Sequence, residues 1–100
     1  MPSAATTRRP AATLPPASPE QIAAATIALL AAIEGAPAGS PAATAFRSAL
    51  RRKGQALAEA GGPAALADLL TRVRTADSAR ANTREAIVDE AWAGLPAWRR

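Results

Sequence analysis

The chain of 100 residues contains no cysteine, histidine or tyrosine, and it has only one phenylalanine and two tryptophans. The absence of cysteine and histidine excludes zinc fingers, iron–sulfur clusters, thiol nucleophiles and imidazole bases. We therefore expect no metal, no other cofactor and no catalytic residue. The sequence predicts a protein that is not an enzyme, although it could be a noncatalytic subunit of one.

Long hydrophobic runs are also absent. The longest extends from Ile22 to Ile33 and is interrupted only by Thr26, whereas a membrane-spanning helix needs about 20 apolar residues. The N-terminal Met-Pro-Ser lacks the charged and apolar regions of a secretory signal. We therefore expect a cytoplasmic protein that has no membrane partner. The enrichment in alanine, arginine, proline and glycine is typical of a GC-rich, bacterial coding bias.

Large apolar side chains are scarce although 49% of the residues are hydrophobic, because 30 residues are alanine and only 19 are leucine, isoleucine, valine, methionine, phenylalanine or tryptophan. A fully buried leucine or isoleucine contributes roughly 1.5–3 kcal/mol to folding, and alanine contributes much less. A monomer with so small a core is expected to be only marginally stable, which favours self-association or docking on a partner.

The net charge of +4 comes from the two ends of the chain. Residues 18–97 contain eight basic and eight acidic side chains, and the surplus consists of Arg8, Arg9, Arg99 and Arg100. The body of the protein is therefore neutral, and no strong attraction of nucleic acid to a folded face is indicated.

Residues 1–17 are rich in proline, alanine and threonine and have no periodic apolar pattern, so they are predicted to form a disordered arm. Residues 18–100 are predicted to form a single helical domain. Ser18-Pro19-Glu20-Gln21 is a helix start with a capping box, and it predicts a first helix over 19–34 that ends at Gly35. This helix is apolar almost all round, so we expect it to be the most buried element.

A second helix is predicted over 41–60, from Ser40-Pro41 to a stop at Gly61-Gly62. Gly54 lies in its middle, where glycine costs about 1 kcal/mol relative to alanine. We infer that a neighbouring helix approaches Gly54 closely or that the helix bends there.

A third helix begins at Pro63, and its apolar stripe is Leu66, Leu69, Leu70 and Val73. Two alternatives remain for the polar stretch that follows: a break near 75–78, which we favour, or one helix over 64–93. The last helix ends at Gly94-Leu95-Pro96. The predicted fold class is all-α, a small bundle of three to four short helices with a disordered N-terminal arm.

Three groups of residues are candidate sites. A basic cluster on the second helix could bind a phosphate group or an acidic partner, or it could be only a solvated face: Arg47, Arg51, Arg52 and Lys53. The C-terminal end could bind a protein partner, or its tryptophans could close the core: Trp92, Trp98, Arg99 and Arg100. Three acids on the last helix could hold Mg²⁺, although pairing with arginines is favoured: Glu85, Asp89 and Glu90.

The contrast between strong helix signals and a small core favours a non-enzymatic protein–protein interaction module. We expect a small helical accessory, adaptor or assembly subunit that self-associates as a homo-oligomer or docks on a larger protein. The alternative is a small nucleic-acid-associated protein that uses the basic cluster and the arginine-bearing termini for phosphate contacts.

Overall fold

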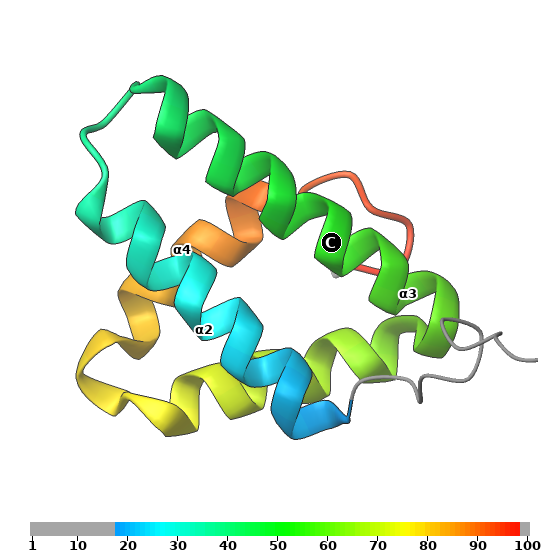
Figure 1. Ribbon diagram of the computed structural model, residues 1–100. Coiled ribbons are helices and arrows are strands. Elements are labelled where there is room, and N and C mark those ends of the chain that lie inside the picture. The colour runs from blue at the N-terminus through cyan, green and yellow to red at the C-terminus, as the bar shows by residue number, and fades with distance from the viewer. Residues whose placement is uncertain (1–17, 99–100) are drawn as a thin grey trace, which may run out of the picture.

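The computed structural model describes residues 18–98, and within these residues it contains helices and no strand. The elements are α2 (Pro19–Gly35), α3 (Pro41–Ala76), the short 3₁₀ helix η1 (Ser78–Arg80) and α4 (Ala81–Ala91), arranged as Figure 1 shows. The predicted all-α class is confirmed. The predicted disordered arm, residues 1–17, lies outside the described residues.

Both predicted Ser-Pro helix starts are present. The Ser18 hydroxyl accepts a hydrogen bond from the Gln21 amide, and the Gln21 side chain accepts one from the Ser18 amide, which completes the capping box. Ser40 caps α3 by accepting from the amide of Ala43 at 3.1 Å. These side chains satisfy amides that the first helical turn leaves without partners.

Two breaks divide the second half of the chain. At Gly62 the backbone leaves the helical region, with φ of 71°, and Pro63 restarts the helix, so α3 is two helical segments joined at a kink. The predicted stop at Gly61-Gly62 is therefore confirmed. Asp77 separates α3 from η1, which confirms the break predicted near 75–78 and makes a single helix over 64–93 wrong.

The core lies where α2 and α4 pack against the two segments of α3. Its largest fully buried side chains come from all three helices and the turn after α4: Trp92, Leu30, Leu50, Leu66, Val73, Val88 and Thr26. The Thr26 hydroxyl donates to the carbonyl of Ile22 at 2.8 Å, so this polar group is satisfied inside the core.

A close approach in the core joins Gly54 and Trp92. A Cβ built on Gly54 would lie 2.5 Å from Cε2 and 2.7 Å from Cδ1 of the Trp92 indole. Because Gly54 has no side chain, the indole reaches the helix backbone, and its Nε1 donates to the Leu50 carbonyl at 2.9 Å. The close approach that the sequence predicted at Gly54 is therefore confirmed, and the partner is a tryptophan.

The expectation that the first helix is the most buried element is wrong. Only one side of α2 is buried, through Ala23, Thr26, Leu30 and Ile33. Its other side carries alanines that remain exposed to solvent. The cause is geometric, because α2 lies between the two segments of α3 and in front of α4, and no other helix of the described residues covers its outer side (Figure 1). No helix in the described part of the chain is long and apolar enough to cross a membrane.

Candidate functional site

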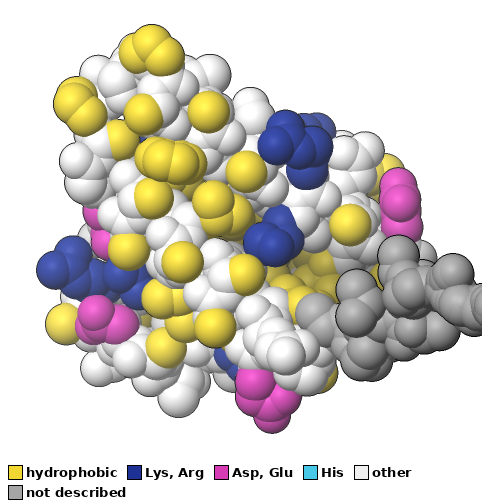
Figure 2. All heavy atoms as spheres, viewed as in Figure 1, with side chains coloured by type: hydrophobic (Ala, Val, Ile, Leu, Met, Phe, Trp, Pro, Cys, Tyr) yellow, Lys and Arg dark blue, Asp and Glu magenta, His cyan; other side chains and the backbone are white. Residues whose placement is uncertain are grey.

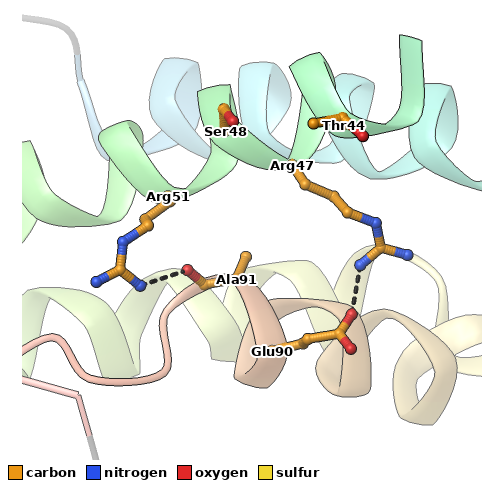
Figure 3. A pocket seen from close by; sticks show the side chains of 6 residues that line it. All are labelled: Thr44, Arg47, Ser48, Arg51, Glu90 and Ala91. Carbon is orange, nitrogen blue, oxygen red and sulfur yellow. Dashed lines mark hydrogen bonds and ion pairs between the residues drawn. The ribbon is translucent and has the colours of Figure 1, made fainter. Parts of the chain in front are cut away.

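Two arginines of the predicted basic cluster face the C-terminal end of α4. Arg47 and Arg51 lie one helical turn apart on α3, and Figure 3 shows both side chains extending toward α4. Nη1 of Arg51 donates to the carbonyls of Ala91 at 3.0 Å and Ala93 at 2.7 Å. Arg47 forms an ion pair with Glu90. Arg51 thus supplies donors to the carbonyl end of α4, where cations are favoured.

A shallow hollow of about 300 Å³ lies between these two arginines. Its lining residues include two arginines, two residues with hydroxyls and one carboxylate residue, and they are Thr44, Arg47, Ser48, Arg51, Glu90 and Ala91 (Figure 3). The hollow is open to solvent along one side of α3. Its donor groups suit an oxyanion, and it offers no nucleophile paired with a base.

The other two members of the basic cluster lie apart from this hollow. Arg52 is exposed and Lys53 is half-buried, and neither forms an ion pair with another residue of the described chain. The four basic residues therefore do not form one surface. The i, i+4 spacing of Arg47 and Arg51 places them on one side of the helix, but the sequence does not show that this side faces α4.

The structure corrects the partner-binding prediction for Trp92. Its side chain is fully buried, so it packs in the core and is not an anchor for a partner. Trp98 is half-buried, and its ring meets that of Trp92 edge to face with centroids 4.8 Å apart. Its Nε1 donates to Asp89 at 3.2 Å. The prediction for Arg99 and Arg100 lies outside the described residues.

A second hollow, of about 370 Å³, lies beside Trp98. It is formed mainly by apolar side chains of the second segment of α3, and its lining is Pro63, Ala67, Leu70, Thr71, Ala97 and Trp98. The C-terminal turn therefore contributes Ala97 and Trp98 to the wall of an apolar hollow, and Trp98 also packs against Trp92.

The acidic side chains of α4 have partners within the chain. Glu85 pairs with Arg74 and Glu90 pairs with Arg47. The pairing with arginines that the sequence favoured is thus confirmed for these two residues. No group of three acidic residues that could hold a metal ion occurs between residues 18 and 98.

The most buried ion pair joins residues that the sequence analysis did not connect. Arg84 of α4 reaches Glu34 at the end of α2, with Nη2 3.1 Å from Oε1, and the two side chains are 8% and 16% exposed. Arg80 lies 3.6 Å from the same carboxylate. These residues are separated by about 50 positions, and no local pattern marks such a pair.

At the other end of α2, Arg72 connects α2 to α3. It donates to Asp68 at 2.8 Å and lies 3.9 Å from Glu20. The hydrogen bond to Asp68, and then the charge of Asp68, raise the pKa of Arg72. The Arg72 guanidinium is fully charged at neutral pH with or without this effect. Arg72 therefore holds a permanent positive charge at this end of α2 and has no role in proton transfer.

The exposed side of α2 is the third candidate surface. Between Gln21 and Glu34 the helix has no charged residue. Its solvent-facing positions are alanines, with two half-buried aliphatic side chains beside them: Ala24, Ala25, Ala28, Ala31, Ile27 and Leu29. Figure 2 shows apolar side chains over this face of the molecule and charged side chains mainly around it. We call these six residues the α2 face.

No family model, no curated protein and no solved structure matches this chain. Its function is therefore inferred from its own residues and their geometry.

Proposed function

We propose that the protein is a non-enzymatic interaction module that pairs with a second copy of itself through the α2 face. The observation that carries this proposal is the charge-free exposed side of α2. Helices on the surface of a globular protein normally carry polar or charged residues on their outer side, and helices that are apolar all round are buried. One side of α2 is buried within the chain, through Ala23, Thr26, Leu30 and Ile33, and the α2 face is the side that a partner would cover.

The small size of the exposed side chains favours a helix as the partner. Alanines such as Ala24, Ala28 and Ala31 allow two helix axes to come close, near the lower end of the usual 8–10 Å range. Two copies can place the same face against each other about a two-fold axis, which is the commonest symmetry of homo-oligomers.

Charges at the ends of α2 favour an antiparallel arrangement. Glu20 lies in the first turn, and its side chain is 77% exposed. Arg80 lies beside the last turn, next to Glu34, and its side chain is 57% exposed. An antiparallel pair brings Glu20 of each copy to the end where the second copy has Arg80, and it also opposes the two helix dipoles.

Light scattering on the purified protein over a concentration series tests this proposal. We expect a dimer that dissociates on dilution, and a thermal midpoint that rises with protein concentration because the dimer stabilises the fold by mass action. Ala28→Glu is expected to give a monomer with an intact helical spectrum, since it adds a charge to the middle of the α2 face.

Ala45→Glu is the matched control, because Ala45 is also an exposed alanine, within α3. This variant is expected to keep the dimer. A wild-type protein that is monomeric at every concentration would contradict the proposal, and so would a dimer that both variants leave unchanged.

Nucleic-acid binding ranks second. It requires several basic side chains on one surface, whereas Arg47 and Arg51 are turned to α4 and Arg52 lies apart from their hollow. A peak that carries nucleic acid and loses it in moderate salt would favour this alternative.

A further inference from the structure

We propose that the hollow between α3 and the end of α4 binds a phosphate group, and that Arg47 and Arg51 are its main ligands. This site lies between α3 and α4 and includes no residue of the α2 face. It therefore does not depend on the pairing of two copies.

The first argument is the charge of Arg51. Its hydrogen bonds go to the carbonyls of Ala91 and Ala93, which are neutral groups. Within the described residues it forms no ion pair with a carboxylate. The two carbonyls hold the guanidinium in place at the rim of the hollow, and no carboxylate of the described residues neutralises its positive charge.

The second argument is the donor set. Arg47 stands across the hollow from Arg51, and only one of its nitrogens is used in the pair with Glu90 (Figure 3). The hydroxyls of Thr44 and Ser48 also line the hollow, and neither side chain makes a hydrogen bond to another described residue. Two arginines and two hydroxyl side chains thus line the hollow, and guanidinium and hydroxyl groups are donors to phosphate oxygens.

The third argument concerns Glu90, which opposes anion binding. Its carboxylate already occupies Arg47, and its side chain is 73% exposed. An exposed pair of this kind contributes little to stability, so an incoming phosphate can displace the carboxylate from Arg47 while Glu90 turns to water. The two arginines carry two positive charges and Glu90 carries one negative charge. The net positive charge favours a ligand with two negative charges.

Titration with inorganic phosphate, followed by ¹⁵N chemical shifts at constant ionic strength, tests the site. We expect saturable shifts at residues around the hollow. Arg51→Gln is expected to weaken binding by about tenfold or more, because it removes a charged donor. Glu90→Gln is expected to tighten binding by about threefold, because it frees Arg47 from an exposed ion pair.

Arg52→Gln is the matched control. Arg52 follows Arg51 directly but does not line the hollow, so this variant should bind within about twofold of the wild type, as expected for an exposed charge that does not contact the ligand. Ser48→Ala is the milder second variant in case Arg51→Gln fails to fold, and it should weaken binding about threefold.

Equal weakening by Arg51→Gln and Arg52→Gln would overturn the proposal, because it would mean diffuse attraction to positive charge. The absence of saturation would also overturn it. Glycerol phosphate and a phosphoserine tripeptide, titrated in the same way, distinguish a small phosphorylated metabolite from a phosphorylated chain as the source of the group. Light scattering on the same variants keeps this result separate from the pairing of α2, since none of them changes the α2 face.

Discussion

Replacing Gly54 with alanine is the sharpest test of the packing around Trp92. Helix propensity alone predicts a gain of about 1 kcal/mol for glycine to alanine inside a helix. The structure instead predicts a loss of stability, because the added Cβ would lie 2.5 Å from Cε2 and 2.7 Å from Cδ1 of the Trp92 indole. Contacts this short require the ring or the helix to move.

The magnitude follows from three contributions. Forcing an extra methyl group into a packed core typically costs about 1–3 kcal/mol. Displacing the indole also breaks the bond from Trp92 Nε1 to the Leu50 carbonyl, and a buried donor without a partner costs about 1–3 kcal/mol. The propensity gain offsets about 1 kcal/mol of this sum. We therefore expect Gly54→Ala to destabilise the protein by about 1–5 kcal/mol.

Thermal and urea unfolding, followed by circular dichroism and tryptophan fluorescence, measure this change. For a domain of this size 1 kcal/mol corresponds to about 4–8 °C in the thermal midpoint. Gly35→Ala is the control, because a Cβ at Gly35 meets nothing within 4 Å, and it should leave stability unchanged or raise it. A Gly54→Ala protein as stable as the wild type would refute the proposed contact between Gly54 and Trp92.

Two further substitutions test contacts that join distant parts of the chain. Glu34→Gln should destabilise by about 3 kcal/mol, because it leaves the Arg84 guanidinium buried without its main counter-ion, and a change below 1 kcal/mol in urea unfolding would contradict a buried pair. Trp98→Ala should cost at least about 1 kcal/mol, since it removes an edge-to-face contact with Trp92 and uncovers that ring. Loss of α2 pairing without loss of stability would instead make Trp98 part of the interface.

Local signals in the sequence predicted most of the helix boundaries. Ser18 and Ser40 identify helix starts because a hydroxyl can accept from an amide three residues ahead. Gly62 identifies a break because its φ of 71° is favourable for glycine and costly for other residues. Each of these features depends on neighbours within a few positions, and the sequence displays those neighbours directly.

The candidate sites depended on how distant segments pack, and there prediction failed in part. The four residues at 47–53 form a basic cluster in the sequence, yet Arg47 and Arg51 face α4 because α4 ends beside them. Tryptophan is a typical anchor residue for a protein partner. Trp92 is nevertheless buried, because Gly54 on α3 leaves space for its ring. No periodicity within a single helix contains this information.

The same packing explains why the two proposed sites lie on different surfaces. The small core is built where α2 lies between the two segments of α3 and in front of α4, which uses the few large apolar side chains and leaves the α2 face uncovered. Arg47 and Arg51 then lie at the end of α4, where Glu90 is the one carboxylate that pairs with either of them among the described residues. The excess apolar surface and the excess positive charge are therefore separated in space. Pairing of two copies should respond to a charge at Ala28, phosphate binding should respond to the loss of Arg51, and neither change should alter the other function.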